Sequence, residues 1–543
     1  MKLLITSLLI AFTSLTIQAQ PMSNQAIDEL VANTMETFDV PGIAVAVLKD
    51  GETILMKGYG VRSLDTKIPM DEKTLFGIAS NSKAFTAAGL GILKQEGKLD
   101  WDDRVIDYIP EFRLYNPYVT DDFRIRDLLC HRSGMGLGAG DLMIWPDGTD
   151  FTRKDVINNL KYLKQVSPFR TKYDYDNLLY IVAGEIITKV SGMSWEEFIK
   201  EKILNPLGMK KSGASYLRLD DTSNVIAPHA RVEGKVRVVS RTTNELMNAA
   251  GGIYSSVEDM GKWARYLLGV GADSHTSSVG ADSPMSPVRT DSRIGPYIIS
   301  AQTIKELWTP QTIIPVRNPG SYNTHFAAYG LGFRLADEKG YKVISHTGGL
   351  AGMLTKMTMI PELDLAIIVF TNQQSGAAFS AITNQIKDGY YGIKGVDWVE
   401  RYASATSGSS ANAQKIVEKV YAQIQHNDNQ GLVIPDLPVP MKSGIRDLPG
   451  TYTDPWLGNI TISQKGDMLY FLAERSPGLN GEIFWYKGNT FVVKWKDRSM
   501  DADAFILFKL DYEGHPTGFK MKAISPLTDF SFDFHDLNFK KIN

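Results

Sequence analysis

The chain has 543 residues, of which 43% are hydrophobic and 22% are charged, and its formal net charge is -3 at pH 7. This length exceeds one ordinary hydrophobic core, so we expect two or three structural units. The composition is that of a globular chain and not of a disordered one. Because positive charge is not in excess, nucleic acid and anionic membrane surfaces are not expected partners.

The N-terminus carries a targeting pattern. Lys2 precedes an apolar run that extends to Phe12, and Ala19 stands before the polar Gln20. A basic start, a short apolar segment and a small residue predict a cleavable secretory signal over residues 1–19. A membrane anchor is the alternative, but serine and threonine interrupt the run and make it a poor span. We therefore expect a periplasmic or secreted mature protein without a stable membrane span.

Cys130 is the only cysteine, so an intrachain disulfide is excluded. Its neighbour His131 raises the hypothesis of a thiol nucleophile. Sequence neighbours rarely face each other, however, and the pattern from Ile125 onward predicts the end of a helix. We expect a buried structural cysteine. The eight histidines are scattered singly, so neither a metal site nor another cofactor is predicted.

The first 370 residues alternate between strand and helix patterns. Apolar runs at 42–48 and 53–56 flank Asp50-Gly51 and predict a β-hairpin. Helix patterns follow at about 81–96, 195–203 and 257–268. Strand patterns return at 329–335, 342–345, 353–360 and 365–370. Strands at both ends with helices between them predict one sheet built from the two ends of a domain.

Composition changes mark the remaining boundaries. Residues 269–296 are rich in Gly, Ser and Asp and predict a mobile surface insertion. Residues 404–412 are a Ser/Ala/Thr segment that predicts a linker, followed by an amphipathic helix from Ile416 to Ile424. From Leu448 to the C-terminus, short aromatic and β-branched runs alternate with turns, which predicts a small all-β barrel or sandwich.

A serine and a lysine three residues apart provide the first catalytic pattern, in Ala79-Ser80-Asn81-Ser82-Lys83. One helical turn places both side chains on the same face. The helix N-terminus adds positive potential and free N–H groups for a developing oxyanion. A desolvated, neutral Lys83 can remove the proton of Ser80. The motif is short, so on its own it is weak evidence for a catalytic site.

Two further motifs follow in order, Tyr175-Asp176-Asn177 and His346-Thr347-Gly348. With them the chain resembles class C β-lactamases, D-aminopeptidases and related esterases over about residues 25 to 395. The resemblance implies an α/β (α+β) fold, an antiparallel sheet flanked by helices with a helical subdomain, over residues 20–395. It further implies a linker with a helix over 396–444 and a lipocalin-like β-barrel over 445–543.

The resemblance also implies roles for the motif residues. Ser80 attacks the acyl carbon while Lys83 and Tyr175 move its proton, and the backbone N–H groups of Ser80 and Gly349 form the oxyanion hole. Three side chains are implied to bind the substrate: Asn177, His346 and Thr347.

One departure from the family affects the expected substrate. β-Lactamases usually carry lysine where this chain has His346, which is mostly neutral at pH 7 with its ordinary pKa near 6.5. We therefore expect an exported hydrolase of a small ester, amide or short peptide. Three alternatives stay open: β-lactam hydrolysis, a non-catalytic penicillin-binding sensor, and acyl transfer to an amine or alcohol.

The sequence allows a homo-oligomer. The C-terminal barrel is expected to supply no catalytic group, so that a chain ending near Gly431 would still react at Ser80.

Overall fold

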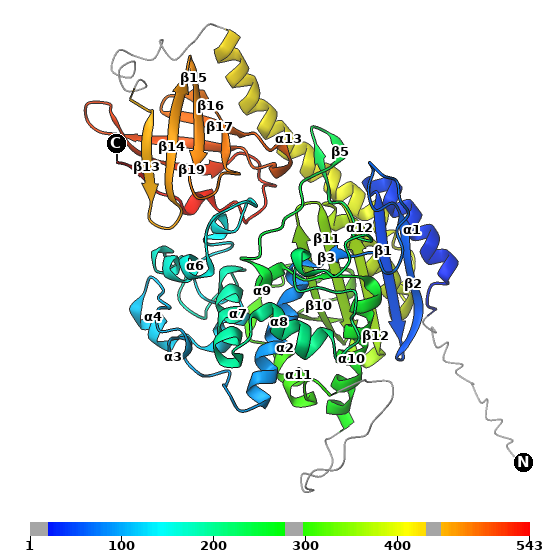
Figure 1. The fold of residues 1–543 in the computed structure, drawn as a ribbon. Helices are drawn as coiled ribbons and strands as arrows, with labels where there is room; N and C mark the ends of the chain where they lie inside the picture. The colour runs from blue at the N-terminus through cyan, green and yellow to red at the C-terminus, as the bar shows by residue number, and fades with distance from the viewer. Residues whose placement is uncertain (1–19, 277–296, 430–446, 543) are drawn as a thin grey trace, which may run out of the picture.

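The structure, a computed structural model, describes residues 20–276, 297–429 and 447–542 (Figure 1). The predicted signal over residues 1–19 lies outside this part of the chain. Within the described ranges, none of the helices has the length and apolar character needed to cross a bilayer.

An antiparallel sheet of eight strands forms the centre of the N-terminal domain, in the order β2-β1-β12-β11-β10-β9-β8-β7. The hairpin of β1 (Gly42–Lys49) and β2 (Glu52–Gly60) provides the first two strands along the chain, and β1 pairs with β12 (Leu365–Thr371). The other strands are β7 (Thr312–Ile314), β8 (Ala327–Tyr329), β9 (Arg334–Glu338), β10 (Tyr341–Leu350) and β11 (Met353–Ile360). The predicted sheet built from both ends of the domain is confirmed.

The central strands are apolar on both faces because helices cover both. Ile43, Val45 and Val47 of β1 contact one core, shared with α1 (Asn24–Phe38) and α12 (Gly376–Tyr391). The alternate residues of β1 face the opposite core, shared with α2 (Ser82–Gln95) and α10 (Val257–Thr276). Alternating side chains of a strand point to opposite faces, so a strand buried on both sides is apolar throughout.

Short helices form a subdomain around α2, which lies against both this subdomain and the sheet (Figure 1). They are α3 (Val105–Tyr108), α4 (Pro117–Asp122), α5 (Ile125–Leu129), α6 (Arg153–Asn159), α7 (Leu178–Ser191), α8 (Trp195–Ile199), α9 (Asn248–Gly251) and α11 (Ala301–Leu307). Two small strand pairs complete the domain: β3 (Phe76–Gly77) with β6 (Tyr254–Ser255), and β4 (His229–Val232) with β5 (Lys235–Val238).

The C-terminal domain is a closed barrel in which each strand pairs with the next along the chain. Its strands are β13 (Gly450–Asp454), β14 (Gly458–Lys465), β15 (Met468–Ala473), β16 (Asn480–Lys487), β17 (Thr490–Trp495), β18 (Ala504–Leu510), β19 (Pro516–Ala523) and β20 (Phe539–Lys541). Aromatic rings fill its interior, among them Tyr452, Phe471, Trp495 and Phe519. The predicted barrel is confirmed.

Three local predictions need correction. The predicted strand at 329–335 is β8 and β9 separated by a tight turn, in which Gly330 N–H bonds to the Phe333 carbonyl and Gly332 has a φ of 82°. The predicted linker at 404–412 lies inside α13 (Trp398–Asn429). Its alanines favour helix and no proline interrupts it, so helical segments on both sides continue through it. The predicted insertion at 269–296 begins with the last turns of α10, and residues 277–296 lie outside the described part.

The barrel packs against the helical subdomain of the first domain, and α13 runs from α12 to the barrel (Figure 1). Val420 and Ile424 of α13 are buried with Val492 and Ile524 of the barrel. Arg475 makes ion pairs with Asp150 and Asp155 at the start of α6. This docking brings the loop between β19 and β20 to the first domain.

Candidate active site

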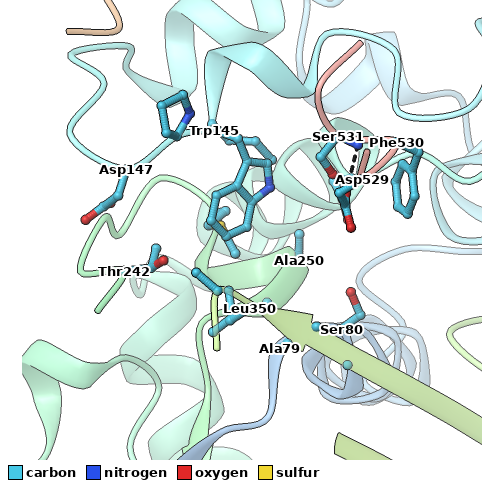
Figure 2. Close-up of a pocket in the computed structure, with 18 of the residues that line it drawn as sticks. Ala79, Ser80, Trp145, Asp147, Thr242, Ala250, Leu350, Asp529, Phe530 and Ser531 are labelled. Carbon is cyan, nitrogen blue, oxygen red and sulfur yellow. Dashed lines mark hydrogen bonds between the residues drawn. The ribbon is translucent and has the colours of Figure 1, made fainter. Parts of the chain in front are cut away.

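A pocket of about 700 Å³ lies beside Ser80 at the junction of the two domains. Figure 2 shows Ser80 toward one end of it, Thr242 and Asp147 toward the other, and Trp145 between them. The barrel residues Asp529, Phe530 and Ser531 lie across the pocket from Ser80 (Figure 2). The pocket is therefore bounded by both domains.

Ser80 lies in a 3-10 turn, η1 (Ala79–Asn81), that leads directly into α2. Ala79 before it has a φ of 49°, in the left-handed region that non-glycine residues rarely adopt. Such strain persists only where the surroundings enforce it, and it gathers at functional sites. The turn presents the partly exposed Ser80 to the pocket while the residues on either side of it are buried.

Lys83 is fully buried one turn beyond Ser80. Its Nζ lies 3.0 Å from Ser80 Oγ, 2.8 Å from Asn177 Oδ1 and 2.9 Å from the Ala250 carbonyl oxygen. Burial lowers the pKa of Lys83 to about 7. The Asn177 amide oxygen and the Ala250 carbonyl oxygen can only accept hydrogen bonds. A neutral Lys83 amine donates its two hydrogens to them and keeps its lone pair for the Ser80 hydroxyl. The arrangement suits a general base.

Tyr175 completes the group around the amine, with its ring centroid 4.9 Å from Lys83 Nζ. Burial raises the pKa of Tyr175 well above its ordinary value, and a hydrogen bond with Ser80 opposes this only partly. Tyr175 therefore stays a protonated phenol near neutral pH. It can donate this proton to a reacting group and be reprotonated by a neighbour such as Lys83. The His131 ring lies against the Tyr175 ring, with centroids 4.1 Å apart and planes tilted by 33°. Burial holds the pKa of His131 well below its usual range.

Asn177 connects Lys83 to a buried carboxyl group that the sequence motifs do not include. Its Nδ2 donates to Asp141 Oδ2 at 2.8 Å, and Ser531 Oγ of the barrel donates to the same oxygen at 2.8 Å. Burial raises the pKa of Asp141 to about 8. The contact between Ser531 and Asp141 spans 390 residues of sequence, so no local pattern indicates it.

Strand β10 forms the wall opposite α2. Thr347 and Gly349 are exposed to the pocket, whereas His346 before them and Gly348 between them are buried. A Cβ at Gly348 would lie 2.1 Å from the Ile78 carbonyl oxygen, so only glycine lets the strand approach the turn that carries Ser80. Gly349 is thus placed near Ser80, as an oxyanion hole of two backbone N–H groups requires.

His346 is neutral, as its sequence context predicts. Its Nδ1 donates to the Thr347 carbonyl oxygen at 2.6 Å, and its Nε2 accepts from the Tyr329 hydroxyl at 2.7 Å. Burial lowers the pKa of His346 to about 3. The family resemblance implies that His346 contacts the substrate directly. A hydrogen bond from the substrate to its ring would require one of these two hydrogen bonds to break.

Arg334 is a cation of this pocket that the sequence motifs do not contain. It lies on β9 opposite Ser345, is exposed, and also lies 3.4 Å from the Tyr173 hydroxyl. Its guanidinium can meet a substrate carboxylate at the place where His346 brings no charge.

Other sequence hypotheses are settled by burial. Cys130 is fully buried, and burial raises the pKa of its thiol to about 12, so the thiol hypothesis fails and the structural one is confirmed. Across the described residues, no group of three or more His, Cys, Asp or Glu side chains is arranged to hold a metal ion.

Comparison with known proteins agrees with this architecture. The family model described as Beta-lactamase matches residues 27–389, and the Domain of unknown function (DUF3471) matches residues 438–541. An unguisins hydrolase of Aspergillus violaceofuscus is 29% identical over 434 residues, covering 76% of this chain and 73% of the relative. Protein flp of Staphylococcus aureus is 28% identical over 260 residues, covering 45% of this chain and 49% of the relative.

Solved structures share the fold. An octameric penicillin-binding protein homologue from Pyrococcus abyssi has a TM-score of 0.58 and 22% identity, and covers 96% of this chain and 100% of its own. A D-amino acid amidase from Ochrobactrum anthropi has a TM-score of 0.53 and 22% identity, over 68% of this chain and 98% of its own. The second domain, expected to be lipocalin-like, is thus a DUF3471 domain that forms an eight-stranded barrel. The chain belongs to the beta-lactamase family and is a serine hydrolase of that family.

Proposed function

We propose that this enzyme cleaves a small ester, amide or peptide bond through an acyl-enzyme on Ser80. The observation that carries the proposal is the environment of Lys83, whose amine lies 3.0 Å from Ser80 Oγ and has its other two contacts with acceptors. A base held in this way, with a pKa of about 7, is half neutral near pH 7 and needs no metal ion to activate the hydroxyl.

The proposed reaction has two halves. Ser80 Oγ attacks the carbonyl carbon as its proton passes to Lys83, and the N–H groups of Ser80 and Gly349 bind the oxyanion. Tyr175 gives its phenolic proton to the leaving group and regains one from Lys83. Water then takes the place of the leaving group and attacks the acyl carbon. Its proton passes by the same route to Ser80 Oγ as the bond between Oγ and the acyl carbon breaks and the acid is released.

Substrate class is argued from the charges of the pocket. His346 contributes no charge, so the exposed Arg334 is the cation beside it that can bind a carboxylate. The relatives support hydrolysis of amide-type substrates, since one is described as an unguisins hydrolase and another as a D-amino acid amidase. Short peptides with a free C-terminal carboxylate therefore fit this pocket better than neutral esters or amides.

Export is a second part of the proposal. Its support is the basic and apolar pattern of residues 1–19, and N-terminal sequencing of the mature protein tests it. A homo-oligomer is proposed as well, supported by the Pyrococcus abyssi homologue, which is described as octameric. Light scattering of the purified enzyme tests this assembly.

Labelling with a fluorophosphonate probe is expected to place the adduct on Ser80, because Lys83 activates that hydroxyl alone. Peptide mass spectrometry locates the adduct, and Ser80→Ala should abolish both labelling and turnover of a chromogenic ester. Ser82→Ala is the matched control, since Ser82 lies in the same turn but donates no group to the pocket. An adduct elsewhere, with Ser80→Ala active, contradicts the proposal. Labelling of Ser80 without turnover of any ester, amide or β-lactam indicates the sensor instead.

Replacing Arg334 with glutamine is expected to raise KM about tenfold for amides that carry a free carboxylate, and to leave matched neutral amides unchanged. The loss of one charge-assisted hydrogen bond accounts for this magnitude. Arg334→Lys should recover part of the difference. Steady-state kinetics with pairs of amino-acid amides and dipeptides measures it. Equal effects on charged and neutral substrates would remove Arg334 from substrate recognition.

A further inference from the structure

The loop of the barrel between β19 and β20 reaches the neighbourhood of the catalytic lysine. We propose that Ser531 of this loop and Asp141 are positioning residues that orient the Asn177 amide toward Lys83. The inference deepens the proposed function and rests on it only in taking Lys83 as the base of Ser80.

The contacts form one continuous chain. Ser531 Oγ and Asn177 Nδ2 both donate to Asp141 Oδ2, each at 2.8 Å, and Asn177 Oδ1 accepts from Lys83 Nζ at 2.8 Å. All four side chains are buried, with exposed fractions of 7% for Ser531, 0% for Asp141, 8% for Asn177 and 0% for Lys83. Water therefore does not replace these partners freely, and an unmade hydrogen bond here is costly.

The amide of Asn177 can face Lys83 with either of its two ends. Its oxygen accepts, whereas its NH₂ group only donates. Asp141 Oδ2 accepts from both Ser531 and Asn177, whether the carboxyl group is ionised or carries its proton on Oδ1, which has no partner among the described residues. It therefore holds the NH₂ end of Asn177 and leaves the amide oxygen for the amine. With the oxygen and the Ala250 carbonyl taking the two hydrogens of Lys83, the lone pair of the amine is directed at Ser80.

The barrel also fixes the backbone that carries Asp141. Asp533 Oδ2 accepts from Gly140 N–H at 2.7 Å. A Cβ at Gly138 would lie 2.6 Å from the Phe530 carbonyl oxygen, so the two loops are in close contact. Within the barrel loop, Ser531 N–H bonds to Asp529 Oδ1 at 2.9 Å, which sets the turn that presents Ser531 (Figure 2).

Charge links the same groups. Burial raises the pKa of Asp141, and the donors Ser531 and Asn177 oppose that rise. The carboxylate of Asp141 in turn raises the pKa of Lys83. Loss of the Ser531 hydroxyl should therefore favour the protonated Asp141 and lower the proton affinity of Lys83. Other titratable or charged groups face Lys83, Asp141 or the rings around them: Asp176, Asp533, Tyr173, Tyr175, Tyr180, His131, His346 and Arg334.

The test compares three full-length variants: Ser531→Ala, Ser531→Thr, and Ser476→Ala as the matched control. Ser476 is a buried barrel serine whose hydroxyl has no hydrogen-bond partner among the described residues. The measured quantity is the rate of Ser80 labelling by a fluorophosphonate as a function of pH. We expect Ser531→Ala to react about tenfold more slowly at its optimum and to move the acid limb to lower pH by about half a unit. Ser531→Thr and Ser476→Ala should both match the wild type.

A second measurement does not depend on activity. NMR titration of [13Cε]lysine enzyme, with Lys83→Arg for assignment, reports the pKa of Lys83 directly, and it should fall in Ser531→Ala. If the fluorophosphonate does not react with Ser80 of the wild type, but the pKa of Lys83 still falls in Ser531→Ala, the proposed function is contradicted and the inference stands. Equal titrations in wild type, Ser531→Ala and Ser476→Ala would overturn the inference. A slower Ser531→Ala with an unchanged acid limb, not restored by threonine, would also overturn it.

Discussion

Replacing Lys83 with methionine is expected to lower kcat/KM by about two to four orders of magnitude, the range for a lost general base. Methionine keeps the apolar stem and the packing volume but leaves Asn177 Oδ1 and the Ala250 carbonyl without their donor. Wild-type kcat/KM should fall about tenfold for each pH unit below 7, because the protonated amine, with a pKa of about 7, cannot take the Ser80 proton. Stopped-flow acylation with a chromogenic ester measures both effects.

Tyr175→Phe tests whether the lysine and the phenol work as one unit. We expect a large loss for this variant as well, and a Lys83→Met/Tyr175→Phe double variant only slightly worse than the poorer single one. Groups that move the same proton give such non-additive losses, since breaking the route once removes most of its benefit. Tyr173→Phe, which alters a neighbouring phenol of the pocket, is the control. Simple addition of the two losses would assign Lys83 and Tyr175 to separate steps.

Much of this site could be predicted because its motifs lie in short, local patterns. Ser80 and Lys83 are one helical turn apart, and Tyr175 and Asn177 immediately precede the apolar helix α7. The sheet was predictable for a similar reason. Alternation of polar and apolar residues indicates a strand buried on one face, and a long apolar run indicates a strand buried on both faces. The local errors arose where a short turn divided an apolar run, as between β8 and β9, or where a helix continued through a segment without apolar periodicity, as in α13.

The rest of the site depends on contacts between distant segments. Asp141 follows a run of glycines that resembles an ordinary loop, and Arg334 has no motif around it. The aromatic residues of the C-terminal segment correctly predict a barrel core. Phe530 and Ser531, which lie outside that core, are among the barrel residues that line the pocket. Sequence periodicity describes which residues a domain buries in itself, and it carries no information about where another domain docks.

Removal of the barrel loop side chains is expected to lower kcat/KM, because the loop contacts Tyr175 and donates to Asp141. A full-length variant with Phe530→Gly, Ser531→Gly and Asp533→Gly should lose about a hundredfold in kcat/KM. It gives up the ring against Tyr175, at 5.8 Å, together with the hydrogen bonds to Asp141 and Gly140 N–H. About 1–1.5 kcal/mol for each of the two lost hydrogen bonds would account for this magnitude. The loop lies between β19 and β20, so the barrel strands themselves are unchanged.

The loop variant also separates two roles of the barrel. If the loop narrows the pocket as well as orienting Asp141, bulky esters should lose less activity than small ones, because the space that Phe530 occupied becomes available. Circular dichroism and thermal unfolding must show a folded protein. Tyr512→Gly with Glu513→Gly, in an exposed hairpin of the same barrel, is the control for glycine substitution. A folded loop variant with wild-type kcat/KM would support the expectation from the sequence that the barrel supplies no catalytic group. A hundredfold loss with an unchanged melting temperature would instead make the barrel loop part of the active site.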